Sequence, residues 1–425
     1  MMKLETIKSF ILIFLIGTSL LLTFGMWNYK PSIELLSDAK PEDFSLNGTE
    51  ESIRTLIEPR QIVFQVLNQH YGFKNPVEQS DFFKEIQQWE LYNFELEKIE
   101  DNNRAHDVEI TFPTPLPMEL LDNIFTFQVN NLELPIWSFD KVYLTLDKEL
   151  RVIRVEFPSI DGRDKAVAVI QDRKNYEELA SYLEKQDLRK LSVFKNGNDR
   201  SIYIPEGPIK LTRQTKTFSK INPNNLVDVL FSDPSIVRQS NYTNLGTTYF
   251  TDSSQMSVTQ DEARIEYISP GSINENQEPL FAEDLLNKSI SDINSYQGWT
   301  ETFKLMDINT NENVIRYQMY YSGYPVFSPL SIMEQRWGQR LIEYNRPLFR
   351  SNNSLSDNEV TLPSSDEILD YLKQNYKLED INDIQIGYQL NYEKDENIIV
   401  YEPSWFIQQQ INKEWIPINP KENEK

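Results

Sequence analysis

One uncharged apolar run near the N-terminus constrains this chain more than any other feature. From Phe10 to Trp27 the sequence reads FILIFLIGTSLLLTFGMW, and extending the run back to Ile7 adds only one charge, Lys8. A helix of this length is about 30 Å long, which matches the hydrocarbon layer of a bilayer. The run therefore predicts a single transmembrane helix over residues 9–29.

Charges and aromatic residues at the ends of the run predict its orientation. Lys3 and Lys8 flank its start, and Trp27 and Tyr29 lie at its end, where aromatic side chains suit the membrane interface. The positive-inside preference places residues 1–8 in the cytoplasm. We therefore expect a single-pass cell-membrane protein whose bulk is extracytoplasmic.

A cleaved signal peptide is the alternative interpretation of the same run. Thr23-Phe24-Gly25 is a poor small-x-small cleavage site, and the run is longer than the apolar part of a usual signal peptide. An uncleaved anchor is therefore favoured.

The composition of the remaining sequence excludes several classes of function. Asp plus Glu number 65 against 42 Lys plus Arg, so the formal charge is −23, and such a surface repels nucleic acid. The absence of Cys excludes disulfides, thiolate nucleophiles and thiolate metal sites. With only 13 Gly, phosphate-binding glycine loops have little material. Hydrophobic residues at 39% still suffice for packed cores.

Local periodicity predicts an α+β fold of antiparallel sheets with covering helices. Ser364 and Glu367 form a capping-box pattern that predicts a helix start, and Asn196-Gly197 predicts a hairpin turn. Helices are expected over 53–67 (interrupted at Pro59), 81–89, 175–183, 226–231, 282–296 and 366–376. Strands are expected over 108–112, 125–129, 142–146, 152–157, 167–170, 191–194, 201–204, 247–250, 256–258, 263–268, 302–306, 314–321, 332–337, 340–344, 384–392, 398–401, 405–409 and 415–418.

No catalytic or metal-binding set is recognisable. The chain has two histidines, His70 and His106, and no nucleophile-elbow pattern accompanies either, so surface or capping roles are favoured. Asp307 to Asn313 resembles the start of a calcium loop, but Glu312 stands where an EF-hand needs Gly, and Gln318 where it needs Glu. A solvated hairpin turn is the better interpretation. We expect no enzymatic activity, no cofactor and no metal site.

Two sets of residues are candidates for contact with a partner. In the anchor, small residues let helices approach closely, and this face comprises Ile11, Leu15, Thr18, Leu22 and Gly25. The stretch from Gly207 to Val227 contains no acid and carries Lys210, Arg213, Lys216 and Lys220. This basic set could hold an anionic partner, although flanking prolines favour an exposed, merely solvated connector.

Several short segments resemble a known family. The chain resembles the YycH family, membrane-anchored regulators of an essential cell-wall sensor histidine kinase in low-GC Gram-positive bacteria. The segments that carry this resemblance are Met2–Ser9, Glu109–Pro113, Tyr203–Glu206, Leu230–Pro234 and Glu266–Pro270. The C-terminal part also looks like the companion protein YycI, in Tyr321–Ser328, Tyr344–Leu348, Gly387–Gln389 and Pro403–Trp405.

This resemblance implies three extracytoplasmic parts and two protein partners. We expect a first α+β domain over residues 30–206, a middle β-rich domain with a helical linker over 207–295, and a C-terminal YycI-like α+β domain over 296–425. The implied partners are a sensor histidine kinase of the YycG/WalK type and a YycI-like companion. The resemblance implies two-component regulation without catalysis.

Two other classes of function stay open from the residues alone. A membrane-anchored module could bind a cell-wall polymer or glycan through the basic set or through exposed aromatic side chains. An anchored hydrolase could use paired carboxylates, although no pair stands out among 65 acids.

Overall fold

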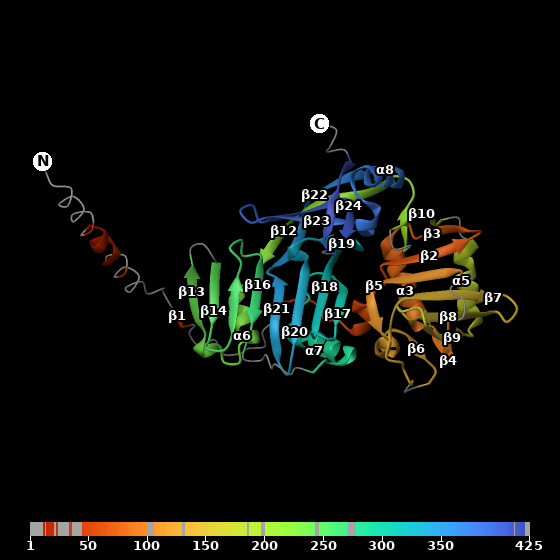
Figure 1. Cartoon of the computed structure of the whole chain (residues 1–425), viewed down its shortest axis with the longest axis horizontal. Helices are drawn as coiled ribbons and strands as arrows, with labels where there is room; N and C mark the ends of the chain where they lie inside the picture. Colours follow the sequence, from red (N-terminus) through yellow and green to blue (C-terminus); the bar gives the residue numbers. More distant parts are fainter. Residues whose placement is uncertain are drawn as a thin grey trace.

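The computed structural model describes residues 12, 14–20, 23, 34–35, 45–99, 106–129, 132–184, 187–196, 200–242, 246–270, 278–411 and 413–420. The predicted span at residues 9–29 lies largely outside this part; those of its residues that are described are helical. Within the described part, no helix is long and apolar enough to cross a membrane. Figure 1 shows the body of the chain to be dominated by sheets, with a few helices packed against them.

The first sheet is built from the N-terminal half of the chain. Its strands alternate buried and half-exposed residues, as in β8, where Ile153, Val155 and Phe157 are buried. Its spatial order is β11-β10-β3-β2-β5-β7-β8-β9-β4-β6. The strands are β2 (Gln61–Val66), β3 (Gln69–Gly72), β4 (Glu90–Lys98), β5 (Val108–Pro117), β6 (Thr126–Phe127), β7 (Ser138–Asp147), β8 (Val152–Pro158), β9 (Asp164–Ile170), β10 (Arg189–Lys195) and β11 (Ser201–Pro205).

Helices cover the apolar face of the first sheet. The longest, α3 (Pro76–Gln88), begins where the Asn75 side chain accepts the Val77 N–H, and it buries Phe82 and Phe83. The others are α2 (Ile53–Leu56), the 3₁₀ turn η1 (Met118–Leu120), α4 (Leu121–Ile124) and α5 (Arg173–Glu184). The helix expected over 53–67 is wrong beyond Leu56, because the apolar residues that follow Pro59 pair as strand β2 with β3 and β5.

The second sheet contains the other described strands. Its path is β1-β13-β14-β15-β16-β21-β20-β18-β19-β23-β24-β12-β22, with β17 on β18 and β25 on β24. The strands are β1 (Glu34–Leu35), β12 (Ile209–Lys220), β13 (Arg238–Tyr242), β14 (Gly246–Phe250), β15 (Gln255–Val258), β16 (Arg264–Ile268), β17 (Phe303–Asn309), β18 (Val314–Tyr321), β19 (Tyr324–Phe327), β20 (Ile332–Trp337), β21 (Leu341–Pro347), β22 (Phe349–Leu362), β23 (Ile381–Glu393), β24 (Ile398–Gln409) and β25 (Trp415–Ile418).

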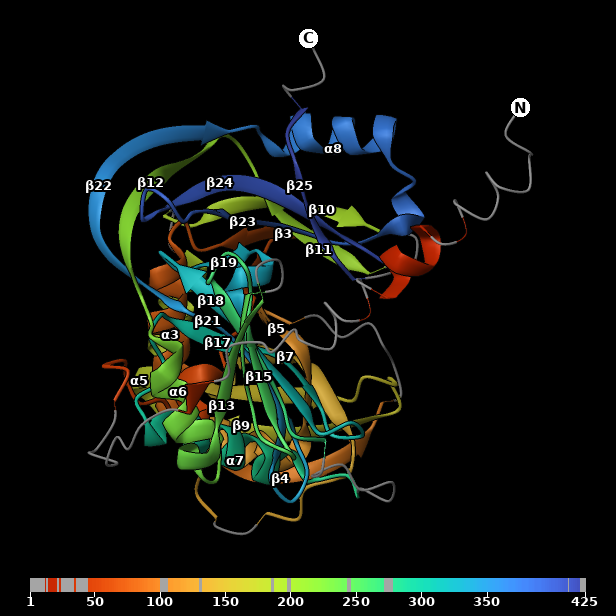
Figure 2. The ribbon, with the colours of Figure 1, turned by 90° about the vertical axis from the view of Figure 1, so that its left-hand side faces the viewer.

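The path of the second sheet turns at the short strand β19. Figure 2 shows β12, β22 and β24 running across the top of the molecule, while β13, β15 and β21 run nearly upright below them. The described strand pairs of both sheets are antiparallel except β19 with β23 and β4 with β6. Strands from residues 207–295 and from 296–425 share this one sheet, and the expected domain boundaries stay predictions.

Three helices accompany the second sheet, as the sequence predicts. They are α6 (Pro223–Leu230), α7 (Ala282–Ser295) and α8 (Ser365–Asn375), with 3₁₀ turns η2 (Pro234–Ile236), η4 (Pro329–Ser331) and η5 (Leu378–Asp380). Helix α7 buries Leu285, Leu286 and Ile293. The capping box at Ser364 is confirmed, since its side chain accepts the Glu367 N–H and the Glu367 carboxylate accepts the Ser364 N–H.

The expected connector within Gly207 to Val227 is wrong, because residues Ile209–Lys220 form the twelve-residue strand β12. It pairs with β22 along its length and with β24 over Gln214 to Thr217. Neither β12 nor β22 carries a regular apolar alternation, and β22 is largely exposed. Without that alternation the sequence offers no strand signal here.

The two sheets meet along a seam with direct contacts. The β10–β11 hairpin of the first sheet packs with α8 onto β23 and β24, in a core that includes Phe194, Ile202, Ile368 and Trp405. Lower down, Lys304 of β17 donates to the carbonyl oxygen of Thr55 at 2.7 Å. These contacts join sequence-distant halves into one body.

Candidate functional site

The predicted anchor face is described at only two of its positions. Leu15 and Thr18 are helical, and the Thr18 hydroxyl donates to the carbonyl oxygens of its own helix, at 3.1 Å from that of Phe14 and 3.0 Å from that of Leu15. Ile11, Leu22 and Gly25 lie outside the described residues. The role of this face stays a prediction.

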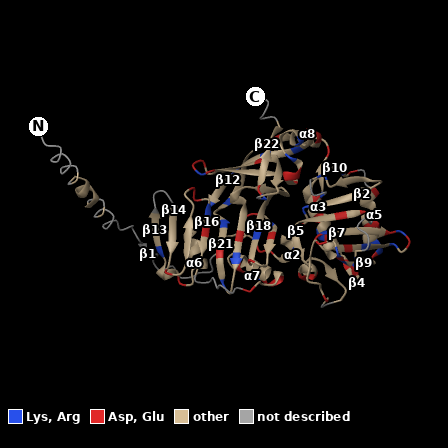
Figure 3. Ribbon diagram, viewed as in Figure 1, with Lys and Arg blue, Asp and Glu red and all other residues tan. Residues whose placement is uncertain are grey.

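The predicted basic set lies on β12, and most of its charge is already paired. Lys210 forms an ion pair with Glu359 at 2.7 Å, and Lys220 with Glu262 at 2.9 Å. Arg213 pairs with Glu402, and the ammonium of Lys216 lies 5.4 Å from the ring centroid of Tyr321. Figure 3 shows the same interleaving of acidic and basic residues over both sheets. Three of the four basic residues thus have acidic partners, and the basic set does not form a patch of unpaired positive charge.

The structure brings both histidines near one buried carboxylate, Glu109 of β5. Lys141 Nζ lies 2.5 Å from Glu109 Oε1, the Tyr203 hydroxyl donates to Oε2 at 3.0 Å, and His106 Nε2 lies 3.5 Å from Oε2. Burial opposes ionisation, but the hydrogen bonds and charges of His106 and Lys141 outweigh it and lower the pKa of Glu109 to about 2.

The ring centroid of His70 lies 5.0 Å from that of Tyr203, with the two rings tilted by 45°, and burial lowers the pKa of His70 despite the nearby Glu109 charge. With a pKa of about 2, the Glu109 carboxylate of this cluster is ionised at neutral pH. That arrangement satisfies a buried charge and presents no activated nucleophile. In the segment from Asp307 to Asn313, the first three residues end strand β17, and residues 310–313 form the predicted hairpin turn to β18.

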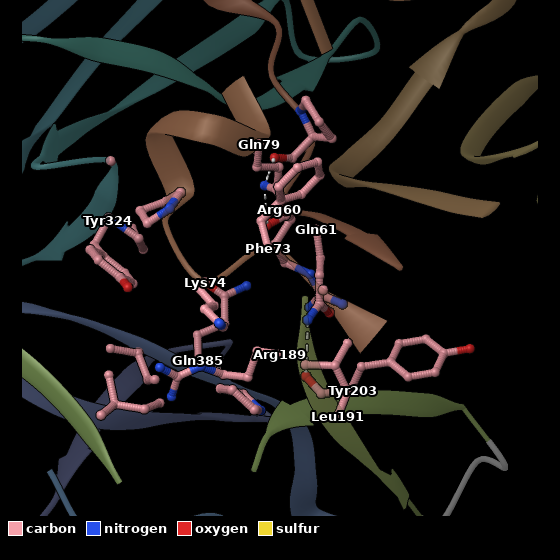
Figure 4. Close-up of a pocket in the computed structure, with 18 of the residues that line it drawn as sticks. Arg60, Gln61, Phe73, Lys74, Gln79, Arg189, Leu191, Tyr203, Tyr324 and Gln385 are labelled. Carbon is pink, nitrogen blue, oxygen red and sulfur yellow. Dashed lines mark hydrogen bonds between the residues drawn. The ribbon is translucent and has the colours of Figure 1, made fainter. Parts of the chain in front are cut away.

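A cavity of about 160 Å³ lies at the seam, and sequence analysis did not anticipate it. We call it the seam cavity. Its lining comes from β2, β3 and α3 of the first sheet, from the β10–β11 hairpin, and from the β18–β19 turn, β23 and β24 of the second sheet. Figure 4 shows Lys74, Arg189 and Gln385 grouped between Tyr324 on one side and Leu191 and Tyr203 on the other.

The rim of the seam cavity is fixed by contacts between the sheets. Arg60 forms an ion pair with Asp383 of β23, and burial lowers the pKa of this arginine to about 10, with the charge of Arg200 adding to the effect. Gly323, at φ +79°, lies so close to α3 that a Cβ there would stand 2.8 Å from Pro76 Cγ. The backbone of Gly323 in the β18–β19 turn therefore packs directly against the Pro76 ring at the start of α3.

The lining of the seam cavity is basic in an acidic chain. Its charged residues are Glu58, Arg60, Lys74 and Arg189. Glu58 is neutralised by Lys304 at 2.6 Å, and Lys74 pairs with the exposed Asp187 at 2.5 Å. Among the described residues Arg189 forms no ion pair, and its Nη1 donates only to the carbonyl oxygen of Pro208 at 3.4 Å.

These residues carry no sequence signal as a set. Some of them precede strand β12 in the sequence and others follow it, and the spacing between them matches no motif. Only the packing of the β10–β11 hairpin against β19 and β23 places them around one space. A weak hint is the Arg189-Lys190 pair of cations opening a strand, which alone predicts nothing specific.

Comparison with known proteins gives consistent matches over nearly the whole chain. The family model described as "YycH protein, N-terminal domain" matches residues 5–187, and "YycH protein, C-terminal domain" matches residues 199–424. A relative from Bacillus subtilis (strain 168), named "Two-component system WalR/WalK regulatory protein YycH", is 21% identical over 456 residues, which cover 98% of this chain and 97% of the relative.

A solved structure has the same fold. The crystal structure of YycH from Bacillus subtilis matches with a TM-score of 0.71 at 16% identity, covering 88% of this chain and 99% of that one. The mixed α and β, sheet-dominated architecture expected from the sequence is thereby confirmed. Because the two family models together span nearly all of the sequence, this chain belongs to the YycH family.

Proposed function

We propose that this chain regulates a two-component system of the WalR/WalK type that controls cell-wall metabolism, and that it does so without catalysing a reaction. The observation that carries this proposal is the match of both YycH domain models, together with the name of a relative aligned over 98% of the chain.

The proposed route of action is contact with a sensor histidine kinase at two levels. The apolar run of residues 9–29 would pack against the spans of the kinase, and the extracytoplasmic sheets would bind a YycI-like companion. A span can bias a two-state kinase only if it contacts the two states with different free energy. Regulation in this proposal is therefore a differential packing energy.

The test is made in the native cell. The gene is deleted and then restored on a plasmid, and transcription from a promoter controlled by the response regulator is measured. A change on deletion that the full-length chain reverses is expected. Unaltered transcription in the deletion strain, with the kinase present at normal abundance, would refute the proposed function.

Partner identity is tested separately by membrane pull-down with the full-length chain, followed by identification of the proteins that co-purify. The kinase and a YycI-like companion are expected. The wall-polymer alternative relied partly on the basic set, and because Lys210, Arg213 and Lys220 are paired with carboxylates, no second function is proposed.

A further inference from the structure

The seam cavity has the properties of a ligand site. Its lining carries a net positive charge although the chain carries −23, its walls are partly apolar, and it lies between two sheets. We propose that the seam cavity binds a small organic anion, a carboxylate or phosphate monoester with an apolar body, and that the bound anion contacts both sheets.

The positive charge of the seam cavity resides mainly on Arg189. Of the lining charges, Glu58, Arg60 and Lys74 each have an ion-pair partner at 4 Å or less, namely Lys304, Asp383 and Asp187. Arg189 has none among the described residues. A guanidinium presents a planar fork of N–H donors that matches a carboxylate or phosphate group. Arg189 is therefore the expected anchor for the charged end of the ligand.

Two tyrosines supply further hydrogen-bond donors. Tyr320 and Tyr324 line the cavity from the second sheet, and in the described structure neither hydroxyl has a protein partner. Burial raises the pKa of both phenols, so both stay protonated and able to donate at neutral pH. At Tyr324 the positive charge of Arg189 partly offsets the rise in pKa. The guanidinium and this phenol are therefore close enough to interact electrostatically. Both can serve one anion.

Size and wall chemistry define the rest of the ligand. A cavity of about 160 Å³ is close to one of roughly 150 Å³ that accepts benzene in an apolar core. Phe73, Leu191 and Ile386 supply apolar wall beside the cationic end. The expected occupant thus has one anionic group and an apolar body about the size of a benzene ring, on the order of six non-hydrogen atoms.

Such a ligand would connect the two sheets. Arg189 and Leu191 belong to the β10–β11 hairpin, whereas Tyr324 and Gln385 belong to the second sheet. A molecule that touches both sides stabilises the closed seam by its own binding free energy. The regulatory consequence rests on the proposed function: occupancy of the seam would alter how the extracytoplasmic sheets meet the kinase complex.

The proposal is tested by titrating the purified full-length chain with three probes and measuring binding by calorimetry. Benzoate has the expected anion and body, benzamide is its neutral counterpart of nearly equal shape, and inorganic phosphate is an anion without a body. Saturable binding of benzoate is expected. Benzamide should bind at least about tenfold more weakly because it lacks the charge of a charge-assisted hydrogen bond. Phosphate should also bind at least about tenfold more weakly, because it has no apolar body to bury against the wall. Equal binding of benzamide, or no saturable benzoate binding, overturns the proposal.

Variants locate the site. Arg189→Gln should weaken benzoate binding on the order of tenfold. Lys190→Gln is the matched control, because it removes the same charge from the next residue of β10, which is outside the cavity lining and pairs with Glu206. Tyr324→Phe removes one hydroxyl and tests the site independently if Arg189→Gln lowers the unfolding temperature. Benzoate affinity unchanged in both cavity variants would place binding elsewhere and refute the assignment.

The outcomes separate this proposal from the proposed function. Binding is measured on the purified chain and does not depend on the kinase. A deletion strain with normal transcription would refute the proposed function and leave a positive titration standing, whereas a failed titration would leave the regulatory role standing.

Discussion

The ionisation of Glu109 depends on one partner three residues away, His106, and on one from another strand, Lys141. Glu109 is almost fully buried, yet its pKa falls to about 2 because the hydrogen bonds and charges of His106 and Lys141 outweigh the effect of burial. Its ordinary value is 4.5. A lowered pKa in the folded state contributes stability that is fully present above pH 4.5 and is lost as the pH falls toward 2.

The first prediction follows from this linkage. Glu109→Gln should lower the free energy of unfolding by about 3 kcal/mol at pH 7, since each pKa unit corresponds to about 1.4 kcal/mol. The difference in free energy of unfolding between Glu109→Gln and the unsubstituted protein should become smaller below pH 4.5. Chemical denaturation at several pH values measures it, with Glu149→Gln in the exposed β7–β8 turn as the control. A gap that does not change between pH 7 and pH 3 would contradict the assigned role of Glu109.

Gly323 gives a second prediction at the same scale. Its φ of +79° strains any other residue, and a Cβ would also meet Pro76 of α3. Gly162 has a similar φ of +71°, and nothing lies within 4 Å of a Cβ placed there. Gly162→Ala should therefore lose stability only through the unfavourable backbone conformation. We expect Gly323→Ala to cost at least about 1 kcal/mol more than Gly162→Ala in thermal unfolding. Equal losses would mean that the seam opens freely at this contact.

Strand β12 lacks the alternating apolar residues of most strands, and ion pairs to neighbouring strands help to hold it in the sheet. Along most of its length β12 faces β22 and β24 with polar side chains, and cross-strand ion pairs match its cations to acids. Lys210 and Glu359 lie diagonally across the β12–β22 ladder, and opposite charges at such neighbouring cross-strand positions stabilise it, each pair by about a few tenths of a kcal/mol. The basic set is thus largely a structural device of the second sheet.

A charge-swap experiment tests this view of β12. Lys210→Glu should destabilise the chain slightly, by roughly 0.5 kcal/mol, because Glu359 then faces a like charge. The double variant Lys210→Glu with Glu359→Lys should recover most of the loss, and the difference should shrink in high salt. The cycle is measured by urea unfolding. A double variant no more stable than Lys210→Glu would show that the pair contributes nothing.

The same swap separates partner binding from folding. If the basic set also contacts a companion protein, the double variant should fold normally and still bind the companion more weakly, because the surface charge pattern is reversed. Normal companion binding by the well-folded double variant would remove Lys210 from the proposed interface.

In the whole molecule, two sheets in contact form one body, which comes after the predicted transmembrane helix (residues 9–29) in the sequence. The seam joins the sheets through the Arg60–Asp383 pair, the Gly323–Pro76 contact and the core under α8. Such a body can pass a change at one end to the other only if the seam has more than one arrangement or if the span itself carries the signal. The two routes give different experimental results.

The prediction at this scale concerns the span. Exchanging residues 10–26 for an unrelated apolar helix keeps membrane insertion and removes the face of Ile11, Leu15, Thr18, Leu22 and Gly25. Transcription controlled by the response regulator should then shift toward the deletion level at equal protein abundance. A matched control exchanges only the residues of the opposite helix face. Full regulation by the exchanged chain would assign the signal to the extracytoplasmic sheets.

Local sequence patterns were enough to predict the elements whose signals lie within a few neighbouring residues. Helix α8 begins where the Ser364 hydroxyl and the Glu367 carboxylate, three residues apart, satisfy free N–H groups, and every second residue of β8 is buried. The α+β class follows from the same patterns. Each depends on residues within one turn or one strand, so no knowledge of distant neighbours is required.

Four features depend on contacts between distant segments: the strand state of β12, the partners of its cations, the Glu109 cluster and the seam cavity. In each of them the decisive partner comes from a distant segment, as Glu359 does for Lys210 and Asp383 for Arg60. Residues 61–66 show the same limit, since their apolar run fits a helix as well as a strand until β3 and β5 supply hydrogen bonds on both sides. Periodicity reports which face of an element is buried, and it carries no record of what covers that face.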